Sequence, residues 1–214
     1  MLTNLSENNS IIQHYLTQIR DKEIQKDTLR FRKNLFRIAQ ILAYEISKQL
    51  NYETVQTETP LATVETSIIQ EKPIICSILR AGLVMHEGFL DFYDQSDSAF
   101  VSAYRKHSTP EEFEIVVEYM ASPNLKDKTI ILIDPMLATG RSMYLAYQAL
   151  CKHGKPKNVF IASLIASEQG LIYVKHFMPN ASIFTAAIDN DLNENSYIIP
   201  GLGDAGDLAY GIKL

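Results

Sequence analysis

Apolar runs and amphipathic stretches alternate along the chain from residue 73 onwards. The run at 128–134 is nearly continuous and rich in β-branched residues, which is typical of a parallel strand buried on both faces. Comparable runs predict further strands at 73–79, 99–104, 113–120, 159–166 and 182–187. Helical periodicity predicts helices at 83–93, 141–153 and 168–177. The alternation indicates the α/β class, with a mostly parallel central sheet flanked by helices.

The first 70 residues follow a different pattern. Residues 10–20 and 27–50 both have helical periodicity, and the second stretch carries an apolar stripe too broad for a solvated helix. Either an arm or subunit contact, or a place on the core as a capping helix, would cover that stripe. Residues 52–70 alternate around Pro60, which predicts a short hairpin or edge strands. We expect one domain, 1–214, that begins with a helical arm at 1–50.

The composition is that of an ordinary globular chain. Its 214 residues are 46% hydrophobic, enough for a substantial core, and the net charge of −5 argues against a nucleic-acid partner. There is no apolar run near 18 residues and the N-terminus is polar, so we expect no membrane span, no secretory signal and a cytoplasmic protein. The two cysteines, Cys76 and Cys151, are expected to be reduced thiols in the core.

Candidate chemistry gathers where the central strand ends. Asp134 closes that strand, and Thr139, Gly140 and Ser142 lie where the next helix begins. Small hydroxylated residues and a glycine at such a turn leave backbone N–H groups free to bind a phosphate. The neighbouring acid can hold sugar hydroxyls or the water shell of Mg²⁺. The pattern therefore predicts a phosphate-and-sugar site at the carboxyl end of a central strand, where open α/β sheets bind ligands.

Two arginines follow other predicted strands. Arg80 and Arg105 would bring guanidinium groups to the same edge, which favours a ligand with more than one phosphate group, although each could instead form a surface ion pair. A polar loop is expected at 106–111. Neither a P-loop nor a dinucleotide-binding glycine pattern is present, which argues against a kinase or a dehydrogenase. The histidines lie apart from any nucleophile motif and are expected to be structural or exposed.

The last part of the chain, 190–211, has no periodicity and is rich in glycine. It holds four of the nine glycines, namely Gly201, Gly203, Gly206 and Gly211. Such a density of glycine in a compact domain indicates a backbone shaped to approach a ligand.

Two segments of the chain resemble a known family. The run Asp134-Pro135-Met136-Leu137-Ala138-Thr139-Gly140-Arg141-Ser142 resembles the 5-phosphoribosyl-1-pyrophosphate (PRPP) loop of the uracil phosphoribosyltransferases, usually D-P-M-L-A-T-G-G-S. The run Tyr197-Ile198-Ile199-Pro200-Gly201-Leu202-Gly203-Asp204-Ala205-Gly206-Asp207 is similar to the uracil-binding segment of the same family. Residues 78–83 and Tyr104-Arg105 match two further stretches, and the resemblance extends from about residue 61 to the end.

This resemblance implies a type I phosphoribosyltransferase fold with a C-terminal base-binding hood at 190–214. It implies the transfer of 5-phosphoribosyl from PRPP to uracil, giving UMP and pyrophosphate, with Mg²⁺ bound through PRPP. The implied catalytic residues are Asp134, Arg105 and Asp204. The implied PRPP-binding residues are Arg80, Arg105, Asp134, Pro135, Met136, Leu137, Ala138, Thr139, Gly140, Arg141, Ser142 and Asp204. The implied uracil-binding residues are Tyr197, Ile198, Gly203, Asp204 and Ala205.

Some positions depart from the family pattern. Arg141 stands where the family has glycine, so its side chain either points away from the phosphate or, as we prefer, adds a donor to it; a positive φ there would strain the loop. Leu208 replaces a basic residue. A nucleotide-dependent RNA-binding regulator, a catalytically silent relative and an enzyme for another base remain as alternatives. The broad stripe of the helix at 27–50 favours a homodimer or higher homo-oligomer.

Overall fold

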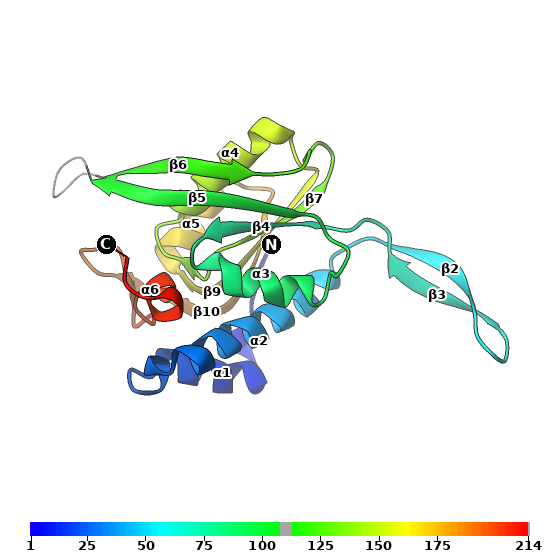
Figure 1. Cartoon of the computed structure of the whole chain (residues 1–214), viewed down its shortest axis with the longest axis horizontal. Helices are drawn as coiled ribbons and strands as arrows, with labels where there is room; N and C mark the ends of the chain where they lie inside the picture. The colour runs from blue at the N-terminus through cyan, green and yellow to red at the C-terminus, as the bar shows by residue number, and fades with distance from the viewer. Residues whose placement is uncertain (108–112, 214) are drawn as a thin grey trace.

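The computed structural model describes residues 1–107 and 113–213, and it describes side chains outside 103–118 (Figure 1). Within that part an eight-stranded sheet has the order β1-β10-β9-β7-β4-β5-β6, with β8 paired to β9. Its strands are β1 (Leu2–Asn4), β4 (Ile74–Leu79), β5 (Ser98–His107), β6 (Phe113–Ala121), β7 (Thr129–Ile133), β8 (Met136–Leu137), β9 (Asn158–Ser167) and β10 (Ser182–Asp189). The pair β5–β6 is antiparallel and the other pairs are parallel, which confirms the predicted sheet.

Different helices cover the two faces of this sheet. Side chains alternate along β7, so Ile131 and Ile133 point to one face, and Ile130 and Leu132 point to the other. The first face packs on α2 (Thr28–Ser47) and α3 (Gly82–Leu90), and the second packs on α4 (Arg141–Leu150) and α5 (Glu168–Phe177). The run in β7 is fully buried, as its composition predicts.

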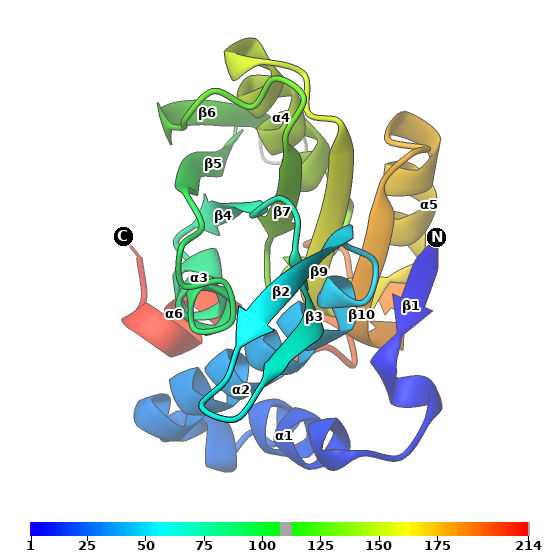
Figure 2. The same cartoon turned by 90° about the vertical axis from the view of Figure 1, so that its right-hand side faces the viewer.

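The long helix α2 is a core-capping helix. Its buried face includes Phe31, Leu35, Ile38, Leu42 and Ile46. The helix α1 (Ile11–Arg20) packs against α2 from outside, beneath the sheet in Figure 2. Of the two places that the sequence left open for this helix, the structure therefore supports the one on the core.

The hairpin predicted at 52–70 is present and extends away from the body of the molecule (Figure 1). It consists of β2 (Tyr52–Glu58) and β3 (Thr63–Ile69), which pair antiparallel as a separate two-stranded sheet. The exposed apolar side chains Val64 and Ile68 lie on one of its faces, and Leu61 is exposed at its tip.

Several elements differ from the predictions. The strand β5 continues through His107, so residues 106 and 107 of the predicted loop at 106–111 belong to a strand, and residues 108–112 lie outside the described part of the chain. The short strands β1, β8, β11 (Asp191–Leu192) and β12 (Ile198–Ile199) and the helix α6 (Ala205–Tyr210) were not predicted. Cys76 is buried as expected, whereas Cys151 is only partly buried. No helix in the described part of the chain is long and apolar enough to cross a membrane.

A close approach of α3 to α2 at Gly88 gives a test of the packing. A Cβ added at Gly88 would lie 2.7 Å from the Phe36 carbonyl oxygen and 2.8 Å from the Ala39 Cβ. We expect Gly88→Ala to lower the free energy of unfolding by about 1–3 kcal/mol, because the overpacking outweighs the gain in helix propensity. Urea unfolding measures the change. The exposed neighbour supplies the control: Glu87→Ala should leave stability almost unchanged, and equal stability of the two variants would contradict the packing.

Candidate functional site

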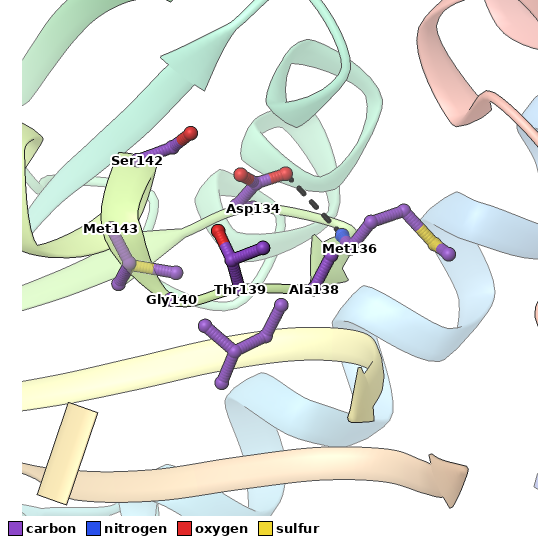
Figure 3. Close-up of a pocket in the computed structure, with 8 residues that line it drawn as sticks. Asp134, Met136, Ala138, Thr139, Gly140, Ser142 and Met143 are labelled. Carbon is purple, nitrogen blue, oxygen red and sulfur yellow. Dashed lines mark hydrogen bonds between the residues drawn. The ribbon is translucent and has the colours of Figure 1, made fainter. Parts of the chain in front are cut away.

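The segment after β7 continues along the neighbouring strand β9, parallel to it and in the same register as β7. Asp134 is partly buried at the carboxyl end of β7, and its Oδ1 accepts a hydrogen bond from the Met136 N–H at 3.3 Å (Figure 3). Residues 136–137 form β8, which pairs with β9. This pairing fixes the loop next to the neighbouring strand, and it was not visible in the sequence because the strand has two residues.

The same loop also packs against the start of α5. The Ser167 hydroxyl donates to the Ala138 carbonyl oxygen at 2.6 Å and accepts from the Gly170 N–H at 2.9 Å. A Cβ at Gly170 would lie 2.3 Å from the Ala138 oxygen. The loop can therefore rest on α5 only because residue 170 is glycine, and neither Ser167 nor Gly170 was predicted as part of the site.

The loop ends at the N-terminus of α4. Gly140 has φ +75° and caps this ten-residue helix, and the Arg141 N–H donates to Thr139 Oγ1 at 3.4 Å. The free N–H groups of a first helical turn attract anions. Residues of this turn line a small open hollow, whose lining residues are Asp134, Met136, Leu137, Ala138, Thr139, Gly140, Ser142 and Met143. Figure 3 shows the Asp134 carboxylate and the Thr139 hydroxyl facing the same space.

Two residues of the predicted phosphate loop do not line the hollow. Pro135 is buried beneath the loop, and Arg141 is exposed outside it. Among the described residues, positive φ values outside glycine occur only at Asp127 and Ser196. Arg141 therefore has no left-handed backbone strain, and its side chain is exposed and is not among the residues that line the hollow.

Arg80 and the C-terminal tail meet beside the loop. Arg80 Nη2 donates to Asp207 Oδ1 at 2.9 Å and to the Gly211 carbonyl oxygen at 3.1 Å. Asp204 caps α6 by accepting from the Asp207 N–H, and its other oxygen accepts from Lys213 Nζ at 3.1 Å. The predicted hood therefore does reach one of the two predicted arginines. The other, Arg105, lies in β5, but its side chain is outside the described part of the chain.

The two acids of the site have opposite pKa shifts. Burial raises the pKa of Asp134 to about 7, against the effect of the hydrogen bond from Met136, and the charge of Asp204 adds to the rise. Burial would also raise the pKa of Asp204, but hydrogen bonds from the Asp207 N–H and from Lys213 outweigh it and lower the pKa. The charge of Asp204 acts on Asp134, and Arg80, at the end of the strand beside β7, pairs with Asp207, so the tail lies next to the loop.

The residues predicted to bind a base lie along this tail. Ile198 in β12 and Ala205 at the start of α6 are buried, whereas Tyr197 is largely exposed. Gly203 is exposed with φ +94°, and in the described part of the chain its backbone N–H and C=O make no hydrogen bond. A free peptide group beside two buried apolar residues can read the polar edge of a flat ligand.

Two other expectations concern side chains near the site. His86 is buried, with Ser77 Oγ 2.7 Å from Nδ1 and Ser98 Oγ 2.9 Å from Nε2, and burial lowers its pKa. This confirms a structural role for that histidine. Leu208, where the resemblance led us to expect a basic residue, packs against the core.

Comparisons with known proteins agree on one family. A family model described as uracil phosphoribosyltransferase matches residues 6–212. A uracil phosphoribosyltransferase of Porphyromonas gingivalis is 50% identical over 98% of both chains. One of Sulfolobus acidocaldarius is 40% identical over 94% of this chain and 96% of its own. The solved structure of a protein from Aquifex aeolicus covers 100% of both chains with a TM-score of 0.88 and 31% identity.

The raised pKa of Asp134 predicts a pH-dependent cost to folding. Below pH 4 both the folded and the unfolded chain hold this proton. Between pH 4 and about 7 the folded chain keeps a proton that the unfolded chain loses, so stability falls as the pH rises. We expect Asp134→Asn to be more stable than the parent at pH 8, by about 1–3 kcal/mol, since each pKa unit corresponds to about 1.4 kcal/mol and the site is open to water.

Thermal unfolding at pH 4 and pH 8 measures this difference. It should shrink to about 0.5 kcal/mol at pH 4, where the carboxyl is protonated in the folded chain and close to half protonated in the unfolded chain. The exposed Asp94→Asn is the matched control and should show no such change with pH. A stability gain at Asp134→Asn that is the same at both pH values would contradict the shift.

Proposed function

The chain belongs to the uracil phosphoribosyltransferase family, and we propose that the loop after β7 and the C-terminal tail together form its active site. As a member of this family it is a pentosyltransferase that converts uracil and PRPP into UMP and pyrophosphate. The observation that carries the placement is the ion pair at 2.9 Å between Asp207 of the tail and Arg80, whose strand β4 pairs with β7. It joins an anion-binding hollow to a segment suited to a base.

The 5′-phosphate of PRPP would bind in the hollow at the start of α4. The N–H groups of the first turn and the hydroxyls of Thr139 and Ser142 supply donors, and the helix dipole favours the negative charge. Asp134 would accept hydrogen bonds from the ribose hydroxyls. Since those bonds favour the carboxylate, ligand binding would lower its pKa from the value near 7.

The reaction breaks the anomeric C–O bond of PRPP and builds positive charge on the ribose, as glycoside cleavage does. Stabilising the departing pyrophosphate is then the main electrostatic task. Arg80 and Arg105 would hold it. The described contacts of Arg80 use only Nη2, which leaves the donors on Nε and Nη1 for phosphate oxygens.

The acids at the site also fit Mg²⁺, which prefers oxygen ligands and is commonly held by one or two carboxylates together with substrate phosphates. The described residues include no cluster of three metal-ligating side chains. When bound, Mg²⁺ would neutralise charge on the pyrophosphate oxygens, with Asp204 holding it through water.

Uracil would lie against the tail, where Ile198 and Ala205 are buried and the backbone of Gly203 is free. Main-chain groups that pair with the two carbonyls and the ring N–H groups of uracil would reject cytosine, because its amino group presents a donor where uracil presents an acceptor. Tyr197 would border this site, with its ring exposed and its backbone tied to Asn193.

We also propose that the protein is a homo-oligomer, now on different grounds from the sequence. The stripe of α2 is covered by this chain's own core, so it no longer supports a subunit contact. The hairpin β2–β3 supports one instead, since isolated two-stranded hairpins are marginal in water and Val64 and Ile68 are exposed on one face. A second copy of the chain would cover that face.

Incubation of the purified protein with Mg²⁺, PRPP and each nucleobase in turn tests the function. UMP should form from uracil, with little or no product from cytosine or from purines. Asp204→Ala should reduce kcat/KM by at least about 100-fold without loss of fold, because it removes a charge that faces the reacting group. Absence of UMP from a folded parent protein would refute the activity, and a near-normal rate for Asp204→Ala would refute the placement of the site.

A second prediction concerns the arginine in the phosphate loop. Because Arg141 is exposed and does not line the hollow, Arg141→Gly should keep kcat and the KM for PRPP within about threefold of the parent. Steady-state kinetics with varied PRPP measures both. A loss of activity beyond tenfold would show that the side chain supports the phosphate or the loop itself.

A further inference from the structure

We propose that Arg20 and Asp189 are positioning residues of the uracil site, which fix the turn from which the base-binding tail departs. This inference rests on the proposed function of the tail. Neither residue lies near the PRPP loop in sequence, and Arg20 comes from the C-terminal end of α1. The contact joins residues 169 positions apart.

The contact is a closed set of charge-assisted hydrogen bonds. Arg20 Nη1 donates to Asp189 Oδ2 at 2.7 Å, and Nη2 donates to Oδ1 at 2.9 Å. The same Nη1 donates to the Gly201 carbonyl oxygen at 3.0 Å, and the Gly201 N–H donates to Asp189 Oδ2 at 2.9 Å. One ion pair thereby holds both the N–H and the C=O of Gly201. Such a bidentate pair fixes direction as well as distance.

The turn held in this way tolerates little change. Gly201 has φ +54°, and a Cβ there would lie 2.1 Å from the Ile198 carbonyl oxygen. The side chain of Asp189 is only 7% exposed and that of Arg20 is 24% exposed. Removing the arginine would leave a buried carboxylate without its counter-charge, so the turn would have to open and let water reach it.

The residues assigned to uracil lie directly beside this anchor. Ile198 precedes Gly201 by three positions, and Gly203 to Ala205 follow it. A second arginine, Arg32 of α2, donates to the Ala209 carbonyl oxygen at 2.8 Å and holds the far end of the same segment. The unbonded N–H and C=O of Gly203 therefore lie, along the chain, between Gly201, which Arg20 of α1 holds, and Ala209, which Arg32 of α2 holds.

The PRPP loop has separate supports. It rests on Ser167 and Gly170 of the β9–α5 junction, and no described contact joins it to Arg20. Loosening the anchor should therefore affect uracil far more than PRPP. This selectivity distinguishes a positioning role from a general contribution to stability, which would affect both substrates.

The experiment compares Arg20→Gln and Arg20→Lys with the parent enzyme and with Arg30→Gln. Arg30 forms an exposed ion pair with Asp27 on α2 and is the matched control. We expect Arg20→Gln to raise the KM for uracil by about tenfold or more, with the KM for PRPP within about twofold. Arg20→Lys keeps the positive charge but loses the two parallel donors of the guanidinium, so its rise in the KM for uracil should be smaller than that of Arg20→Gln.

Each outcome decides the proposal. An unchanged KM for uracil in Arg20→Gln, or an equal rise of both KM values, overturns it. If Arg20→Gln does not fold, Arg20→Lys decides by the same ratio: a selective rise of about threefold in the KM for uracil supports the role, and a uniform or absent rise overturns it. Inactivity of the parent enzyme would instead refute the proposed function, so the two failures are distinguishable.

Discussion

The parallel alignment of β4, β7, β9 and β10 is the constraint on which the site depends. Parallel neighbours end at the same edge of a sheet, so the residues that follow them meet there whatever their separation in sequence. Arg80, Asp134, Ser167 and Asp189 stand at these four ends. Two of them face the proposed ligands, and the other two hold the backbone that does: Ser167 holds the phosphate loop and Asp189 holds the turn of the tail.

The charges at this edge are balanced within the chain itself. Arg80 is paired with Asp207, and Lys213 is paired with Asp204. Burial raises the pKa of Asp134 to about 7, so this carboxyl is partly protonated near neutral pH and less charge is buried. In the proposed reaction, the pyrophosphate binds Nε and Nη1 of Arg80 while Asp207 stays on Nη2, and a ligand-bound cation competes with Lys213 for Asp204. Binding then leaves neither protein charges nor ligand charges without partners.

Local pattern was enough to predict most of the fold and to select the loop at the centre of the proposed site. The run in β7 is apolar on both faces, which only a covered parallel strand requires, and Asp134 and the α4 turn follow from where that run stops. Contacts between residues far apart in the sequence could not be predicted from any local sequence pattern. Ser167, Gly170 and the pair Arg20–Asp189 became evident only through contacts. Elements of two or three residues, such as β8, were missed because they are too short to show a period.

Arg141 illustrates how the fold decides what a motif can tolerate. The family pattern suggested that two successive glycines are needed at this turn, which would make an arginine costly. In the structure the left-handed backbone conformation is needed at Gly140 alone, where a Cβ would also meet the Gly170 carbonyl oxygen at 2.9 Å. The next residue already belongs to the first turn of α4, where φ is negative and side chains point outwards. The contact of the loop with α5 therefore requires glycine at 140 and 170, whereas position 141 does not need a left-handed backbone.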